Sequence, residues 1–168
     1  IKGIDLKENV DIKIVLKDME LIAGDLREIR KGRWQFEFTA NGSELTANSS
    51  TVPIDYSFNI DDQRYHLEEF RFNPVNKKIF GKGEGTSVAE YDIYLKGHDS
   101  LGNEVVFYLA SVSGKDLVFK YSNIYGDLSD EITYITLTPY AAKLPEKSGK
   151  LSDDYRQVGE EFTINIKK

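Results

Sequence analysis

The histidines are the first residues to examine for chemistry, because an imidazole can act as a base or bind a metal ion. His66 and His98 are the only two, and neither has a second ligand at helical or hairpin spacing. Asp127, Asp130 and Glu131 could collect calcium, but their spacing fits no EF-hand loop. The absence of cysteine excludes thiolate ligands, a cysteine nucleophile and disulfide bonds. We therefore predict no catalytic residue, no metal site and no cofactor.

A search for sequence motifs of catalytic and phosphate-binding sites also indicates no such site. The sequence has no Gly-x-Ser-x-Gly, His-Glu-x-x-His or P-loop pattern. The glycine-rich stretch 81–85 precedes no helix that could bind phosphate, so we expect a flexible hairpin loop. Adjacent acids such as Asp61-Asp62 and Glu68-Glu69 point to opposite faces of a strand. They are therefore expected to be solvated charges rather than the carboxyl pair of a glycosidase.

Aromatic residues are the one group with a functional alternative. The chain contains ten tyrosines, nine phenylalanines and one tryptophan, and exposed rings can stack on sugars or contact proteins. Most of them fall on the apolar side of an alternating pattern, as a core requires. Tyr94 and Tyr108 fall on the opposite side and could form a second packed layer or a surface patch.

Alternation of apolar and polar residues is the main signal for the fold. It predicts strands over 10–16, 33–40, 54–60, 65–72, 78–82, 117–121, 131–140 and 162–166, and a hairpin over 91–110 whose turn is 99–103. The apolar positions predict a core that contains Trp34, Phe36, Phe38, Tyr56, Phe58, Phe107, Phe119 and Ile164.

Several local irregularities are also expected. The apolar parity changes between Tyr65 and Phe72, which predicts a β-bulge near Glu68-Glu69. Pro139 should end its strand, because proline has no N–H for a ladder. Capping signals allow one short helical turn near 25–32 and another over 152–159.

Length and composition favour a folded all-β protein. The chain has 168 residues, 40% of them hydrophobic, and we predict one domain over 1–168 with a possible leader at 1–9. The fold class is an antiparallel β-sandwich, Ig-like in general build, with about nine or ten strands. The net charge of −6 disfavours nucleic acid and anionic lipid as direct partners. Because the chain begins at Ile1 and has no long apolar run, we interpret it as a fragment.

Three motifs occur together in a suggestive order: Trp34-x-Phe36-x-Phe38, Asp99-x-x-Gly102-Asn103 and Leu137-Thr138-Pro139-Tyr140. Over roughly residues 30–168 they resemble the C-terminal extracytoplasmic domain of membrane-anchored, anti-sigma-factor-like proteins of Gram-positive bacteria. That family domain has no assigned function and no catalytic residues to transfer. The resemblance implies a β-sandwich outside the cell, tethered by a membrane span that is absent from this fragment.

Two functional classes remain open beside an enzyme, for which no feature of the sequence argues. The favoured one is a non-enzymatic sensory or protein-interaction module of a membrane-bound regulator, with an unknown protein or cell-envelope component as partner. Its loops at 81–90, 99–103 and 141–159 are the expected recognition surfaces. The alternative is a carbohydrate- or cell-wall-binding domain, which requires a row of exposed aromatic residues on one sheet face.

Overall fold

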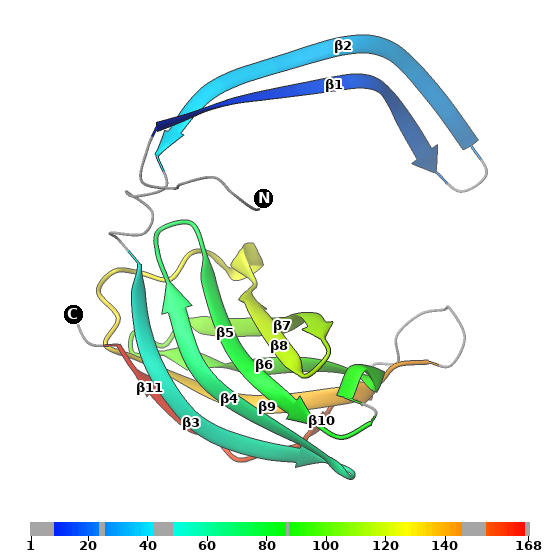
Figure 1. Cartoon of the computed structure of the whole chain (residues 1–168). Helices are drawn as coiled ribbons and strands as arrows, with labels where there is room; N and C mark the ends of the chain where they lie inside the picture. The colour runs from blue at the N-terminus through cyan, green and yellow to red at the C-terminus, as the bar shows by residue number, and fades with distance from the viewer. Residues whose placement is uncertain (1–8, 24–25, 42–48, 87, 146–153, 167–168) are drawn as a thin grey trace. The chain divides into compact units, whose positions relative to one another are not determined.

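Residues 9–23, 26–41, 49–86, 88–145 and 154–166 are described by a computed structural model of the chain (Figure 1). The chain divides into two compact units, residues 1–48 and 49–168, and each is described by itself. The expected single-domain organisation stays a prediction. Residues 1–8 of the expected leader lie outside the described residues, and Asn9 already begins the first strand.

The first unit contains one long hairpin, which we call the arm. Its strands are β1 (Asn9–Ala23) and β2 (Leu26–Asn41), paired antiparallel. The ladder is interrupted between Lys17 and Met19, where Asp18 has a positive φ of 49° and its carboxylate accepts a hydrogen bond from the Gly32 N–H. The helical turn expected near 25–32 is wrong for residues 26–32, because pairing with β1 continues β2 through the local capping signal.

The second unit is a single antiparallel sheet of nine strands. They run in the spatial order β10-β9-β6-β7-β8-β5-β4-β3, and β11 pairs with the same edge of β9 as β10 does, further along the strand. The bounds are β3 (Ser50–Ile60), β4 (Gln63–Phe72), β5 (Lys77–Glu84), β6 (Tyr91–Asp99), β7 (Glu104–Ser113), β8 (Asp116–Tyr121), β9 (Tyr134–Lys143), β10 (Arg156–Gln157) and β11 (Phe162–Asn165). Two short 3₁₀ segments, η1 (Val88–Glu90) and η2 (Asn123–Tyr125), are the only helical turns among the described residues.

The sheet curls into a half-barrel, so that its edge strands β3 and β11 approach each other (Figure 1). At this seam the rings of Tyr56 and Phe162 stack with centroids 4.1 Å apart, and the Tyr56 hydroxyl donates to the Glu160 carbonyl at 2.5 Å. The antiparallel all-β fold is therefore confirmed, and two facing halves of one curled sheet are consistent with a sandwich. The finer Ig-like topology is not established by this strand order.

The concave side of the sheet holds the core. Alternate residues of each strand point inward, and the largest fully buried side chains include Tyr65, Phe70, Phe107 and Phe119. Phe70 and Tyr121 both meet the Phe107 ring edge-on, at centroid distances of 5.8 and 5.5 Å. These edge-to-face contacts join side chains of β4, β7 and β8 in the middle of the core.

The predicted core is correct in the sheet and wrong in the arm. Phe58, Phe107, Phe119 and Ile164 are buried as expected, and Tyr56 is half-buried. Trp34 is half-buried, whereas Phe36 and Phe38 are exposed. The alternation identified their common face correctly, but the described residues of this unit form a two-stranded sheet alone and include no second layer over that face.

Two expectations about irregular backbone can be compared with the structure. The bulge near Glu68 is confirmed, since the β4–β5 register shifts between Leu67 and Glu69. The expectation that Pro139 ends its strand is wrong, because β9 continues to Lys143. On the edge of β9 away from β6, β11 pairs up to Leu137 and β10 begins at Tyr140, so Pro139 faces a gap in the ladder where its missing N–H costs little.

The glycine-rich stretch and the second helical turn also differ from expectation. Gly81 and Gly83 lie within β5, and a Cβ on Gly81 would come within 2.4 Å of the His66 carbonyl oxygen, so close strand packing explains this glycine better than loop flexibility. The helix expected over 152–159 is wrong where it can be checked, because Arg156–Gln157 forms β10. Residues 152–153 lie outside the described residues.

Candidate interaction surfaces

The arm has one apolar face. Cross-strand pairing places Ile12 opposite Phe38, Ile14 opposite Phe36, and Leu16 opposite Trp34. The exposed fractions are 41% for Ile14, 47% for Leu16, 53% for Phe36 and 50% for Phe38. Large hydrophobic side chains are usually the most buried residues of a protein, so four neighbouring ones at this exposure are unusual.

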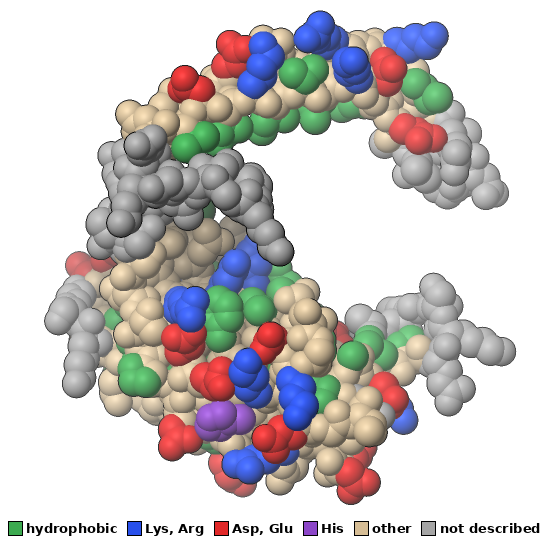
Figure 2. Space-filling view, viewed as in Figure 1, with side chains coloured by type: hydrophobic (Ala, Val, Ile, Leu, Met, Phe, Trp, Pro, Cys, Tyr) green, Lys and Arg blue, Asp and Glu red, His purple; other side chains and the backbone are tan. Residues whose placement is uncertain are grey.

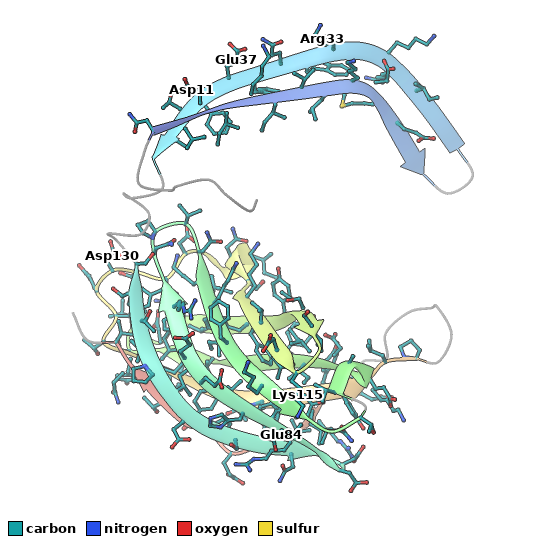
Figure 3. The ribbon with its side chains drawn as sticks, in the orientation of Figure 1. Asp11, Arg33, Glu37, Glu84, Lys115 and Asp130 are labelled. Atoms are coloured by element: carbon teal, nitrogen blue, oxygen red, sulfur yellow. The ribbon has the colours of Figure 1, made fainter. Side chains whose placement is uncertain are left out.

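The opposite face of the arm is polar and internally paired. Lys13 Nζ lies 2.7 Å from Glu37 Oε1, and the Thr39 hydroxyl donates to Asp11 Oδ1 at 2.6 Å. Figure 2 shows charged side chains gathered along one side of the arm and hydrophobic ones along the other, and Figure 3 labels Asp11, Arg33 and Glu37. The arm is therefore amphipathic, with one polar face that is suited to water and one apolar face whose exposure to water is unfavourable.

The size of the apolar face can be estimated from the exposed fractions. If a fully exposed large side chain presents roughly 200 Å², the four exposed residues together present about 380 Å². A contiguous apolar patch of roughly 300–600 Å² on a monomer is often functional. A two-stranded hairpin alone is also marginally stable in water, and a hydrophobic face that packs against another element is what usually stabilises it.

A second surface lies on the convex side of the nine-stranded sheet. Tyr140, Tyr94 and Tyr108 are direct partners across β9, β6 and β7, and all three are half-buried. The Lys96 ammonium lies over the Tyr94 ring at 5.1 Å and over the Tyr140 ring at 5.8 Å from the centroids. Tyr94 and Tyr108 thus occupy the outward positions expected from their parity, as part of a surface row.

Tyr155 covers one end of this row. Its ring meets that of Tyr94 edge-on at 5.2 Å, lies 5.4 Å from the Lys96 ammonium, and its hydroxyl donates to Asp92 Oδ2 at 2.5 Å. Burial, followed by this hydrogen bond to a carboxylate, raises the pKa of the Tyr155 hydroxyl far above its usual value. The Tyr94–Tyr140 end of the row is therefore occupied by the protein's own side chains, and the Tyr108 end is the more open one.

The row continues from tyrosine into basic residues. Tyr108 is opposite Lys120 of β8, Lys120 is opposite Lys78 of β5, and Lys78 is opposite Arg71 of β4. Because neighbouring strands lie about 4.8 Å apart, the six side chains from Tyr140 to Arg71 span roughly 24 Å. We call them the convex row.

The residues first considered for catalysis or metal binding do not come together. The His66 Nδ1 atom lies 2.9 Å from the Ser57 hydroxyl on the outside of β3 and β4, and His98 is exposed on β6. Asp127, Asp130 and Glu131 are exposed in the segment between β8 and β9. The described residues include no group of three or more histidine, aspartate or glutamate side chains that could hold a metal ion.

The turn at 99–103 is a structural device. The Asp99 carboxylate is 1% exposed and accepts hydrogen bonds from the N–H groups of Leu101 and Asn103, both at 2.9 Å, and from the Asn103 amide at 3.0 Å. Burial alone would raise the pKa of Asp99, but these hydrogen bonds outweigh it and hold the pKa below the usual value. Of the expected recognition loops, this one is held rigidly by its own side chains, and 146–153 of the third lies outside the described residues.

Reasoning from the sequence missed the convex row as a whole, although it singled out Tyr94 and Tyr108. Lys78, Lys120 and Arg71 come from three different strands, and only the spatial strand order places them beside the tyrosines. The available signal was that each of these residues occupies an outward-facing position of its strand. Many solvated charged residues occupy such positions too.

Comparisons with known proteins identify the second unit. A model for a family of unknown function (DUF5643) matches residues 49–166, nearly the whole of the unit that begins at Ser49. The match includes the motifs at 99–103 and 137–140, whereas Trp34-x-Phe36-x-Phe38 lies before it. No curated protein matches the chain.

One solved structure has a similar fold. It is described as the crystal structure of the conserved domain protein from Bacillus anthracis, with a TM-score of 0.60 and 18% sequence identity. The alignment covers 96% of this chain and 62% of that one, so the chain spans about three-fifths of its neighbour's length. At this identity the likeness concerns the fold alone.

None of the helical segments in the described parts of the chain is long and apolar enough to cross a bilayer.

Proposed function

Since the chain belongs to a family of unknown function (DUF5643), its membership brings no assigned activity, and we propose that it is a non-enzymatic interaction module of a membrane-bound regulator. The observation that carries this proposal is the exposed apolar face of the arm. The molecule that covers this face is a partner protein, which supplies a second sheet with an apolar face of its own.

The physical case rests on what the arm lacks. Two strands bury one another's backbone groups but leave Ile14, Leu16, Phe36 and Phe38 half in water. Packing a second sheet on this face, at the usual spacing of about 10 Å, removes both sets of side chains from water. The polar face needs no such cover, because its polar and charged side chains either pair across the strands, as Lys13 does with Glu37, or are exposed to water, as Lys17 and Arg33 are.

A non-enzymatic role is supported by the chemistry of the described side chains. Three carboxylates each serve a structural partner: Asp99 caps a turn, Asp92 accepts from the Tyr155 hydroxyl, and Asp61 accepts from the Tyr91 hydroxyl at 2.5 Å. Asp61 and Tyr91 do line an open hollow, but there Asp61 is already paired with Arg156 at 3.0 Å, so both of its oxygens have partners from the protein itself. The proposed place outside the membrane rests on the resemblance of the three sequence motifs to extracytoplasmic domains.

Site-specific photo-crosslinking in the intact protein, in whole cells, tests the proposed use of the arm. A photoreactive side chain at Phe38 on the apolar face should form adducts with one protein segment rich in apolar residues. The same group at Gln35, on the exposed polar face of the same strand, is the matched control and should give little product. Equal, unspecific labelling from both positions would show that the apolar face stays in water and would refute the proposal.

A second candidate function is carbohydrate binding, and the convex row is the observation that favours it. This class requires a row of exposed aromatic residues on one sheet face, and the tyrosines of the convex row are in cross-strand register on one face and half-exposed. The Tyr94 and Tyr155 rings are close to perpendicular, at 79°, so the row is not a flat platform over its whole length. The Tyr108 end is where a sugar ring has access.

A further inference from the structure

Beside Tyr108 the surface is hollowed by about 280 Å³. The hollow lies between the β4–β5 turn, the middle of β7, the end of β8, and the segment that includes η2. Its lining carries two aromatic rings, Tyr108 and the buried Tyr121, with several groups that exchange hydrogen bonds with hydroxyls, including Lys120, Lys77, Asn76, Asn123 and Asp127. This mixture suits a single sugar ring, which offers apolar C–H groups on one side and hydroxyls around its rim.

The charges around the hollow favour an acidic ligand. The Lys77 side chain is only 12% exposed, and its ammonium lies 3.9 Å from the Asp127 carboxylate, too far for a hydrogen bond. Asp127 itself is 81% exposed, so it compensates the Lys77 charge weakly, and the other contact of the ammonium is with the Tyr121 ring, 5.8 Å from its centroid. Two lysines, Lys77 and Lys120, therefore line the hollow against one solvated carboxylate.

The neighbouring strands repeat this excess of positive charge. Lys120 and Lys78 are directly opposite each other on the outer face, an arrangement of like charges that destabilises a sheet. Among the described residues, the ion pairs on β4, β5 and β8 join Arg71 to Glu69, Lys77 to Asp127 and Lys82 to Asp116, and none of them includes Lys78 or Lys120. Although the net charge of the chain is −6, this part of the surface is a strip of basic residues. A bound anion would reduce the repulsion between their charges.

We infer that the hollow and the basic strip together bind an acidic polysaccharide. One sugar ring stacks on Tyr108 in the hollow, and its carboxylate or phosphate group lies against Lys77 and Lys120. The polymer then follows the convex row toward Lys78 and Arg71, whose spacing across strands is close to the length of one sugar unit. This inference rests on the second candidate function and names its ligand class and site.

Calorimetric titration of the chain with four polymers tests the inference. Polygalacturonate supplies carboxylates on sugar rings, phosphomannan supplies phosphates, dextran is neutral, and poly-L-glutamate is acidic without sugar rings. One or both acidic polysaccharides should bind, and binding should weaken as salt is raised. Polygalacturonate alone would indicate a carboxylate ligand, and phosphomannan alone a phosphate ligand. Either result supports the inference.

Variants then locate the site. Tyr108→Ala should weaken binding by at least about tenfold, as the loss of one central contact does, while Tyr108→Phe, which keeps the ring, should retain most of it. Lys78→Glu with Lys120→Glu should abolish binding of the acidic polymers. Lys115→Glu is the matched control, because this exposed lysine lies at the other end of β8 (Figure 3) and should bind as the wild type does.

Three outcomes would overturn the inference. Equal binding of dextran, unaffected by the lysine variants, would leave carbohydrate binding in place and remove the acidic class. Equal binding of poly-L-glutamate with no effect of Tyr108→Ala would make the strip a site for acidic peptides. Binding of none of the four polymers would remove the site altogether, without bearing on the arm.

Discussion

Replacement of Asp99 is the most direct test of how the central hairpin is held. Its carboxylate accepts three hydrogen bonds from Leu101 and Asn103 and is almost fully buried. A hydrogen bond to a charged group contributes about 1.5–3 kcal/mol, but Leu101 and Asn103 are exposed, and water can replace part of what is lost. We therefore expect Asp99→Ala to lower the free energy of unfolding by about 2–4 kcal/mol, and Asp99→Asn to lower it by less, since the amide keeps one acceptor oxygen.

The dependence on pH gives this prediction a distinctive sign. The pKa of Asp99 is lower in the folded than in the unfolded chain, where an aspartate titrates near about 3.9. Its contribution is therefore fully present above the unfolded pKa and is lost as the pH falls through the folded pKa. Urea titrations followed by circular dichroism, at pH 7 and at steps below pH 4, should show a loss in the wild type that Asp99→Asn lacks.

Ser100→Ala is the control for this experiment. It changes the same turn and removes a hydroxyl that accepts from the Thr133 N–H at 2.9 Å, but no carboxylate, so its effect should not vary with pH. A cost of less than 1 kcal/mol for Asp99→Ala, or identical acid dependence in Asp99→Asn and wild type, would refute the reasoning.

Two further predictions concern the core and the location of the protein. Phe107→Ala, at a fully buried position, should cost about 3–5 kcal/mol in the same titration, whereas Phe36→Ala, at a half-exposed one, should cost clearly less; equal losses would show that the arm is packed as a core. In whole cells that make the intact protein, added protease should cut this chain and spare cytoplasmic segments; cleavage only after lysis would contradict the proposed place outside the membrane.

The sequence predicted the strands well because the alternation of apolar and polar residues is a local signal, visible within each strand by itself. The bulge near Glu68 was visible as a change of parity, and the turn at Asp99 as a cluster of turn-forming residues. Alternation shows which side chains share a face, but it does not show what covers that face. Trp34, Phe36 and Phe38 were assigned to the core for this reason, and they lie on the apolar face of the arm.

The sequence could not show which segments from distant parts of the chain lie side by side in the sheet. Pro139 continues its strand because two separate strands, β10 and β11, leave a gap at its edge, and neither could be placed from local signals. The convex row likewise depends on β5 pairing with β8 rather than β6. Parity selected Tyr108 as outward-facing, but the lysines beside it follow from strand order alone.

The distribution of aromatic residues between the two units also has an optical consequence. The single tryptophan, Trp34, lies in the arm, and all ten tyrosines lie after residue 48, in the unit of the nine-stranded sheet. Fluorescence excited at the red edge of indole absorption therefore reports the arm alone, while tyrosine emission originates in the sheet. The emission maximum of Trp34 should move to shorter wavelength when a partner covers the apolar face. Trp34 is therefore an intrinsic fluorescent probe of partner binding, and no label is needed.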